Sequence, residues 1–319
     1  MEPQFKHGES DTFYQAVLTN EHIACDPEGH RSGYLTLVGR PNAGKSTLLN
    51  ALLGQKLSIV SYKAQTTRHR IAGFLSDEMY QIILLDTPGF IIDMRNKLEE
   101  IMMTSVKRSL KDADAVVVLI DVTVDHKEQL ACLAPPPNGP PTAIVLNKID
   151  TVPEEEREAL ADWFQKATSA AAVLPISALH GDGLQDLKDW AVRSMPEGPT
   201  LYPKEQLSEQ PERFFVSEIL REKLFLQYEQ EVPYSCQVNV VEFKERRKGK
   251  DLISVHIVVE REAHRGILLG KGGAALKQLA TAARMDIEEF LQRPVYLEIS
   301  VKVLEGWRQD ATTLKKFGY

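Results

Sequence analysis

The chain has 319 residues, of which 43% are hydrophobic and 26% charged, and its net charge at pH 7 is −7. This length predicts two domains, and the composition is typical of a water-soluble protein with substantial cores. The acidic balance argues against a general nucleic-acid binder, and no apolar run approaches the roughly 20 residues that a membrane-spanning helix needs.

The charge is unevenly distributed along the chain. Residues 1–200 hold 19 Lys and Arg against 27 Asp and Glu, whereas residues 201–319 hold 19 against 18. An acidic half beside a balanced half predicts two domains with different tasks. The three cysteines, Cys25, Cys132 and Cys236, form no pair at metal-binding or redox spacing, which indicates inert thiols in a reducing compartment.

The first 32 residues show no hydrophobic periodicity, so we expect a mobile tail without a secretory signal or a transit-peptide composition. From residue 33 to 196, apolar runs of strand type alternate with helical patterns. This alternation predicts an α/β domain with a doubly wound, mostly parallel sheet and helices on both faces. The predicted strands are 34–38, 70–75, 80–85, 115–120, 143–146 and 173–176, and the predicted helices are 45–53, 96–110, 154–168 and 183–194.

Residues 39–46 read GRPNAGKS and fit G-x-x-x-x-G-K-[ST] between a predicted strand and a predicted helix. Such a turn points backbone N–H groups inward, and the helix N-terminus adds a partial positive charge, so a polyphosphate is favoured there. Lys45 can reach the β- and γ-phosphates, and Ser46 can ligate Mg²⁺. The predicted phosphate-loop residues are Gly39, Arg40, Pro41, Asn42, Ala43, Gly44, Lys45, Ser46 and Thr47.

Residues 81–90, QIILLDTPGF, form a predicted strand that ends in D-x-x-G. Asp86 can hold Mg²⁺ through water, and the N–H of Gly89 can meet a γ-phosphate. Phe90 follows the D-x-x-G and offers no side-chain amide to orient an attacking water. Another group must therefore orient the attacking water, and we expect slow intrinsic hydrolysis. The predicted nucleotide-binding residues of this loop are Asp86, Thr87, Pro88, Gly89 and Phe90.

Residues 143–150, AIVLNKID, indicate guanine as the base. The Asp150 carboxylate can accept hydrogen bonds from guanine N1–H and the exocyclic amine, whereas adenine offers neither donor; such sites reject the wrong partner by roughly 10⁴-fold. Lys148 can lie over the base, and Asn147 is placed to brace the phosphate loop. Backbone N–H groups for guanine O6 are predicted from the turn of Ser177, Ala178 and Leu179.

A switch segment is predicted between the first helix and the second strand, in the sequence QTTRH. Thr67 is preferred to Thr66 as a Mg²⁺ ligand beside the γ-phosphate. Bound triphosphate is expected to order this segment, and hydrolysis to release it. Arg68 and Arg70 remain open as arginines that act in cis on the phosphates. The predicted switch I residues are Gln65, Thr66, Thr67, Arg68 and His69.

A proline-rich, polar linker is predicted at 197–211, and a second domain at 212–319. Its predicted helices are 212–229, 264–269 and 274–291, and its predicted strands are 235–244, 252–260 and 294–303. The order α-β-β-α-α-β is typical of a small α+β domain.

The sequence HRGILLGKGGAALKQLA places a glycine-rich turn, residues 270–273, before a helix, and glycines there let a ribose–phosphate strand approach closely. This is the pattern of a KH-domain G-x-x-G loop, which clamps about four nucleotides. The hairpin tip ERRKGK is a candidate contact for the RNA backbone, with a solvated turn as the alternative. The predicted RNA-binding residues are Ile267, Leu268, Gly270, Lys271, Gly272, Gly273, Lys277, Arg246, Arg247 and Lys248.

Together GRPNAGKS, KAQTTRHRI, LLDTPG, NKID and GKGG resemble the Era family, which combines a P-loop GTPase domain with a type II KH domain. The resemblance covers residues 34–318 and matches the motifs position by position, although Leu179 stands where many GTPases have lysine. Residues 211–240 and 279–298 resemble the plastid branch of the family.

The resemblance implies GTP and GDP binding, Mg²⁺, slow GTP hydrolysis and maturation of the small ribosomal subunit, with the KH groove binding the 3′ end of its rRNA. It makes Asn42 a candidate K⁺ ligand, the alternative being a turn residue that braces the loop. The residues assigned to catalysis are Asn42, Lys45, Thr67 and Gly89.

The resemblance also implies a monomer in the chloroplast stroma, with a bacterial-type cytoplasm as the alternative. Some Era proteins associate with membranes, although this sequence shows no anchor. A hydrolysis-deficient assembly factor and an enzyme that modifies RNA remain alternatives; the second domain shows no catalytic Cys or metal cluster for the latter.

Overall fold

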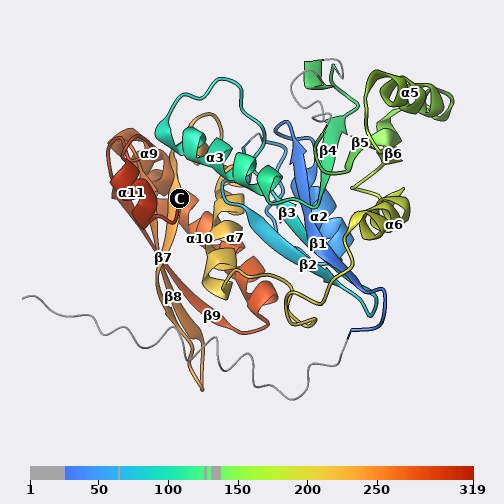
Figure 1. Cartoon of the computed structure of the whole chain (residues 1–319). Helices are drawn as coiled ribbons and strands as arrows, with labels where there is room; N and C mark the ends of the chain where they lie inside the picture. Colours follow the sequence, from blue (N-terminus) through green and yellow to red (C-terminus); the bar gives the residue numbers. More distant parts are fainter. Residues whose placement is uncertain (1–25, 64, 126–127, 131–137) are drawn as a thin grey trace, which may run out of the picture.

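The computed structural model describes residues 26–319 except 64, 126–127 and 131–137. These residues form two units that lie side by side, one drawn from blue to green and the other from gold to red in Figure 1. Residues 1–25 of the predicted tail, with Cys25, and also Cys132 lie outside the described residues. Cys236 is buried, and burial raises the pKa of its thiol to about 12, as expected of an inert thiol.

The first unit is built on a six-stranded sheet in the order β2-β3-β1-β4-β5-β6. β2 runs antiparallel to β3, and the other neighbours are parallel, which confirms the predicted mostly parallel sheet. Each strand lies within three residues of its predicted position. The strands are β1 (Arg31–Gly39), β2 (Ile71–Ser76), β3 (Tyr80–Asp86), β4 (Ala115–Asp121), β5 (Thr142–Asn147) and β6 (Ala172–Ile176).

Helices cover both faces of this sheet (Figure 1). Leu35 and Leu37 of β1 belong to the same core as α2 (Lys45–Leu53) and α6 (Leu184–Ser194), whereas Val38 belongs to the core with α3 (Lys97–Lys111) and α5 (Glu154–Ala167). Successive residues of a strand point to opposite faces. The central strands are therefore buried on both sides and read as continuous apolar runs. A short 3₁₀ turn, η1 (Ile149–Thr151), follows β5.

The prediction of a tail through residue 32 is wrong at its end, because β1 begins at Arg31. Arg31 pairs with Tyr80 of β3. Just before the strand, the Asp26 carboxylate accepts hydrogen bonds from Thr200 N at 2.6 Å and Thr200 Oγ1 at 2.7 Å. Pairing between residues far apart in the sequence thus orders a segment that lacks local periodicity.

The predicted linker, 197–211, lies against the antiparallel edge of the sheet. Phe74 N donates to Leu207 O at 2.8 Å. The buried side chain of Gln81 accepts from Leu201 N and Tyr202 N at 2.7 and 2.8 Å. These hydrogen bonds attach the proline-rich segment to β2 and β3, so it is a fixed connection in this structure.

The second unit has the predicted order α-β-β-α-α-β, with two short α-helices and a 3₁₀ turn in addition. Its three-stranded sheet has the order β7-β8-β9, with β8 antiparallel to β7 and parallel to β9. The elements are α7 (Glu212–Gln227), α8 (Val232–Ser235), β7 (Gln237–Lys244), β8 (Asp251–Val259), α9 (Glu262–Leu269), η2 (Lys271–Gly273), α10 (Ala274–Leu291), β9 (Val295–Val303) and α11 (Ala311–Lys316).

Apolar side chains of the second unit complete the cores of the first. Phe215 of α7 joins the cluster that contains α2 and α6. Val258, Trp307 and Leu314 join the cluster around α3. Burial of such side chains is worth about 1.5–3 kcal/mol each, so it holds the two units together. Within the described ranges, no helix is both long enough and apolar enough to cross a membrane.

Candidate nucleotide-binding site

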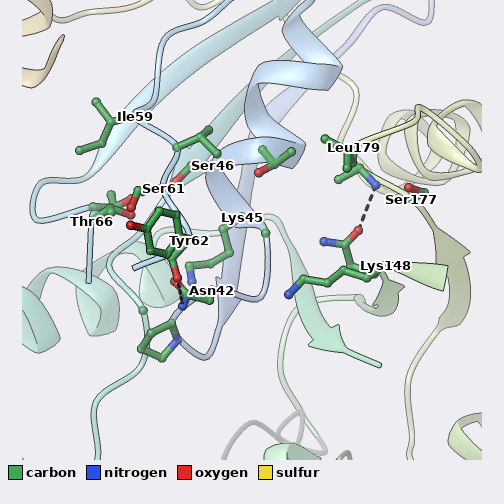
Figure 2. A pocket seen from close by; sticks show the side chains of 18 of the residues that line it. Asn42, Lys45, Ser46, Ile59, Ser61, Tyr62, Thr66, Lys148, Ser177 and Leu179 are labelled. Carbon is green, nitrogen blue, oxygen red and sulfur yellow. Dashed lines mark hydrogen bonds between the residues drawn. The ribbon is translucent and has the colours of Figure 1, made fainter. Parts of the chain in front are cut away.

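A cavity of about 440 Å³ lies where the loops after β1 and β5 meet the segment before β2 (Figure 2). It brings together residues that are predicted from five separate sequence motifs. The predicted residues that line it are Pro41, Asn42, Gly44, Lys45, Ser46, Thr47, Gln65, Thr66, Thr67, Gly89, Asn147, Lys148, Asp150, Ser177, Ala178 and Leu179. Ile59, Val60, Ser61, Tyr62 and Thr151 complete the lining and were not predicted.

The phosphate loop closes tightly around Lys45. Its Nζ donates to Gly39 O at 3.1 Å and to Arg40 O at 3.0 Å. The side chain is 6% exposed, and burial lowers its pKa to about 8. Gly44 has φ 96°, and a Cβ there would lie 2.2 Å from Asn147 Nδ2. Only glycine satisfies both the left-handed backbone and this close approach.

Three oxygen-bearing side chains converge beside Lys45. Ser46 Oγ donates to Asp86 Oδ2 at 2.7 Å and lies 2.9 Å from Thr67 Oγ1, which is itself 3.4 Å from the same carboxylate oxygen. Asp86 is fully buried, and burial raises the pKa of its carboxyl. Its Oδ1 has no hydrogen-bond partner among the described residues. Two hydroxyls and a carboxylate with an unpaired oxygen fit Mg²⁺, which prefers oxygen ligands.

Ser58 contributes to this cluster and was missed by sequence reasoning. Its Oγ donates to Asp86 Oδ2 at 2.9 Å, and the residue is 1% exposed. Asn50 of α2 holds the segment, because its Oδ1 accepts from Leu57 N and Ser58 N, both at 2.9 Å. A serine in the apolar run LSIV carries no motif, so no sequence signal could have identified it.

The base side of the cavity is organised by Asn147. Its Nδ2 donates to Ala43 O at 2.7 Å, and its Oδ1 accepts from Ala178 N at 3.0 Å. The residue thus braces the phosphate loop, as its position predicts, and also fixes the turn after β6. Lys148 forms an ion pair with Asp121, which was not predicted. At Asp150, a hydrogen bond from the Ser177 side chain lowers the pKa of the carboxyl, so the acceptor required for guanine is ionised.

Some predicted nucleotide-binding residues support the loops without lining the cavity. Thr87 is fully buried and donates from Oγ1 to Leu37 O at 2.7 Å. Phe90 packs beside the core around α3, and its N–H donates to Gly39 O at 3.0 Å. The predicted residues absent from the lining are Gly39, Arg40, Ala43, Asp86, Thr87, Pro88 and Phe90.

The hypothesis that Arg68 or Arg70 acts in cis on the phosphates is wrong for this structure. Arg68 is 4% exposed and donates to Cys236 O at 2.7 Å and Tyr234 O at 2.9 Å, both in the second unit. Arg70 pairs with Glu209 at 3.8 Å. These carbonyls lie at the carboxyl end of α8, where a helix leaves carbonyls without a partner, and they accept the hydrogen bonds of the Arg68 guanidinium. The predicted switch residues therefore divide: Thr67 faces the cavity and Arg68 the domain interface.

The GKGG turn has the backbone that its glycines predict. Gly270, Gly272 and Gly273 have φ of 68°, 60° and 80°. A Cβ on Gly270 would lie 2.6 Å from Ala275 Cβ, whereas one on Gly272 would meet nothing within 4 Å. The turn is therefore close-packed at Gly270 and open at Gly272, where a ribose–phosphate strand could approach.

The predicted RNA-binding residues around this turn are at least partly exposed, except Leu268. Ile267 is 51% exposed, but Leu268 is 0% exposed and belongs to the core of the second unit. Leu268 is thus wrong as a groove residue, because successive residues of a helix point about 100° apart and Leu268 is the one that faces the core. The charged predicted residues, all exposed, are Lys271, Lys277, Arg246, Arg247 and Lys248.

Comparisons with known proteins agree over nearly the whole chain. Residues 34–148 match the family of 50S ribosome-binding GTPases, and residues 231–308 match the KH domain. The chloroplastic GTPase ERA1 of Zea mays is 52% identical over 294 residues, which cover 91% of this chain and 71% of that protein. GTPase Era of Thermoanaerobacter is 41% identical over 303 residues, which cover 91% of this chain and 97% of that protein.

Solved structures of Era have the same arrangement of both units. Era in complex with MgGDPNP and nucleotides 1506–1542 of 16S ribosomal RNA gives a TM-score of 0.86 at 38% identity, covering 91% of this chain and 99% of that one. A variant of Aquifex aeolicus Era bound to GDP and AlF4⁻ gives a TM-score of 0.85 with the same identity and coverage. These matches confirm the P-loop GTPase fold and the KH domain, and the chain belongs to the Era family of GTPases.

Proposed function

We propose that this GTPase binds small-subunit ribosomal RNA near its 3′ end and assists assembly of the small ribosomal subunit. The observation that carries the proposal is the open, glycine-rich turn at residues 270–273, bordered by exposed Ile267, Lys271 and Lys277. Open glycines accept a ribose–phosphate strand, and the lysines supply charge to it. The Era structure that holds 16S ribosomal RNA supports this assignment.

We propose a separate task for each of the main residues of the GTPase site. Ser46, Thr67 and Asp86 would hold Mg²⁺, which neutralises charge on the β- and γ-phosphates when bound. Lys45 would exchange its carbonyl partners for phosphate oxygens, and the N–H of Gly89 would face the γ-phosphate. Asp150 would accept the guanine donors. No side-chain amide follows Gly89, because Phe90 occupies that position, and this supports a slow intrinsic rate.

The position of Asn42 supports a role for K⁺ in hydrolysis. Its side chain reaches into the cavity mouth and meets the backbone carbonyl of Tyr62 (Figure 2). An amide oxygen and a backbone carbonyl are ligands of the kind that alkali cations accept. A cation held there would lie beside the phosphates, where it could stabilise the charge that otherwise requires an arginine.

We further propose a plastid location, in the stroma, and a monomeric protein. The chloroplastic relatives from Zea mays and Arabidopsis thaliana, at 52% and 50% identity, support the location. Cell fractionation with an antibody to the chain would test it. Recovery outside plastids, or firmly in a membrane pellet, would contradict the stromal assignment.

The RNA assignment is tested by crosslinking in native extract, followed by sequencing of the bound RNA. Wild-type protein is expected to enrich the 3′ end of small-subunit rRNA. The Gly272→Asp variant, which places a carboxylate where the phosphate strand would lie, is expected to lose that enrichment. Gly272→Ala adds a methyl group that meets no atom within 4 Å and serves as the uncharged control for backbone strain. Random RNA, or equal enrichment by wild type and Gly272→Asp, would contradict the proposal.

A further inference from the structure

A second cavity, of about 540 Å³, lies where the two units meet. The first unit contributes His69, and the second contributes one face of α7, the start of β7 and the carboxyl end of α11. Among the described residues, none lines both this cavity and the nucleotide-binding cavity. A ligand here and a nucleotide in its own cavity can therefore be bound at the same time.

A buried guanidinium, that of Arg221, lines this cavity with one nitrogen unpaired. The residue is 2% exposed. Its Nε donates to Glu218 Oε1 at 2.8 Å, and its Nη2 donates to Glu218 Oε2. Its Nη1 has no hydrogen-bond partner among the described residues. Because a buried charged donor without an acceptor is costly, the free Nη1 indicates that a further acceptor belongs there.

The charged side chains that line the cavity are mostly positive. Arg213 and Lys316 are exposed cations of α7 and α11. With Arg221 they make three cations against one carboxylate, that of Glu218, among the described lining residues. Burial lowers the pKa of His69 to about 4, so its ring adds no charge at pH 7. A phosphate monoester carries about 1.5 to 2 negative charges at this pH and fits the excess better than a carboxylate does.

Aromatic and amide side chains line the cavity beside these charges. Phe214 and Phe317 contribute rings, and Gln237 and Asn239 contribute amides. Gln237 is 5% exposed, and its Oε1 accepts from the Tyr319 hydroxyl at 2.8 Å. Rings can pack on a sugar or a base, and amides can bond their polar edges. The lining therefore favours an organic phosphate, with free phosphate as the other source of the same group.

We propose that this cavity binds the phosphate group of a small molecule, with Arg221 as the buried anchor and Arg213 and Lys316 as exposed partners. Glu218 holds Nε and Nη2 of Arg221 and leaves Nη1 for the phosphate oxygens. Hydrogen bonds from a guanidinium to a phosphate are charge-assisted and strong. A ligand here would contact both units and stabilise them together.

The test is isothermal titration calorimetry on the full chain, with the nucleotide-binding cavity filled by Mg²⁺ and a non-hydrolysable GTP analogue. The analogue keeps the probes away from the phosphate loop. Inorganic phosphate, ribose 5-phosphate and ribose are titrated separately. We expect ribose 5-phosphate to bind and ribose to give no heat of binding. Tighter binding of ribose 5-phosphate than of inorganic phosphate assigns the site to an organic phosphate, and equal binding assigns it to free phosphate.

Two variants at exposed positions test the cations without disturbing a core. Arg213→Met and Lys316→Met should each weaken the binding of ribose 5-phosphate by about threefold, the usual size of an exposed charge interaction. Lys315→Met is the matched control, because Lys315 is an exposed neighbour on α11 that does not line the cavity. It should keep the wild-type affinity.

Arg221 is tested by a paired change, because Arg221→Met alone would leave the Glu218 carboxylate buried and unpaired. Glu218→Gln together with Arg221→Met removes both charges. This double variant should bind ribose 5-phosphate about tenfold more weakly or less, the typical effect of a hydrogen bond to a charged group. Its affinity for the GTP analogue should stay within about twofold of the wild type, which shows that it is folded.

Three results would overturn the proposal. The first is a wild type that binds neither phosphate more tightly than ribose. The second is wild-type affinity in both Lys316→Met and the double variant, and the third is an equal loss in Lys315→Met and Lys316→Met. If an RNA oligonucleotide binds through Lys316 and the small phosphates do not bind, these cations contact an RNA backbone instead.

Discussion

The side-chain nitrogen of Asn42 lies 2.8 Å from the backbone carbonyl oxygen of Tyr62. An amide of the phosphate loop thus meets the main chain of the segment that leads to Thr67. Asn42 has φ 65°, a left-handed conformation that asparagine tolerates better than most residues. The backbone suits a turn residue, and the side chain lies where a cation ligand is needed, so one residue can serve both roles that the sequence leaves open.

The first prediction concerns K⁺. We expect the wild-type GTPase rate to be about tenfold or more higher in K⁺ than in Na⁺, because a charge beside the phosphates can replace part of an arginine's contribution. Asn42→Gly keeps the left-handed backbone and removes the amide, so the difference between the two salts should disappear. Steady-state phosphate release at constant ionic strength measures both. Equal wild-type rates in K⁺ and Na⁺ would remove the role of K⁺.

The second prediction concerns Ser58, which donates to Asp86 Oδ2 at 2.9 Å. Its hydroxyl stabilises the ionised carboxylate, so Ser58→Ala should raise the Mg²⁺ concentration for half-maximal activity by about tenfold, the typical effect of a hydrogen bond to a charged group. A Mg²⁺ titration of GTP hydrolysis measures the shift. Ser61→Ala, in the same cavity wall, should leave it unchanged. An unshifted titration for Ser58→Ala would show that the hydroxyls of Ser46 and Thr67 are enough to stabilise the Asp86 carboxylate.

The third prediction follows from the pKa of Lys45, which burial lowers to about 8. Phosphate binding favours the ammonium form, so the pKa rises in the complex. Below pH 8 Lys45 of the free protein is already protonated, so its ionisation should not make the GTP affinity depend on pH. Above pH 8 the free lysine is neutral, and GTP affinity should fall by up to tenfold per pH unit.

Calorimetry in two buffers with different ionisation enthalpies tests this prediction directly. When GTP binds at pH 8.5, Lys45 should take up a proton from the buffer. At pH 7 Lys45 is already protonated before binding, so this uptake should vanish. Equal proton uptake at the two pH values would contradict the assigned pKa of Lys45.

The strands, the main helices and the phosphate loop could be predicted because their signals are local. Hydrophobic periodicity placed α2 and α10 at the observed bounds, and the glycine at position 44 meets a requirement of the loop itself. Local patterns also located the GKGG turn, although one residue of helical phase decides whether Ile267 or Leu268 faces outward. That phase depends on the core of the KH domain.

Contacts between segments that lie far apart in the chain could not be predicted from the sequence. Arg68 reaches Cys236 O, 168 residues away in the chain, and Asp26 holds Thr200 across 174 residues. Neither partner carries a motif, and each contact includes a backbone group, which almost any residue could supply. For the same reason the role of Ser58 follows only from the folded arrangement.

The last prediction concerns His69, which lies between the two domains. Its ring stacks on Tyr319 with centroids 4.4 Å apart and meets Phe214 edge-on at 5.6 Å. Its pKa is lowered from 6.5 to about 4, mainly by burial; Glu218 opposes this shift, and Arg221 and Arg68 contribute to it. The folded protein therefore keeps His69 neutral at a pH where the unfolded chain would protonate it.

Stability should consequently fall as the pH decreases from 6.5 towards 4, because the unfolded state binds more protons over that range. Between pH 7.5 and pH 5 the loss from His69 is about 2 kcal/mol in the free energy of unfolding. His69→Phe retains an aromatic ring without a titrating group. Between the same two pH values, the free energy of unfolding of this variant should therefore fall by about 2 kcal/mol less than that of the wild type. Urea unfolding of both proteins at the two pH values measures the difference. The same pH dependence in wild type and His69→Phe would show that His69 does not titrate in this range.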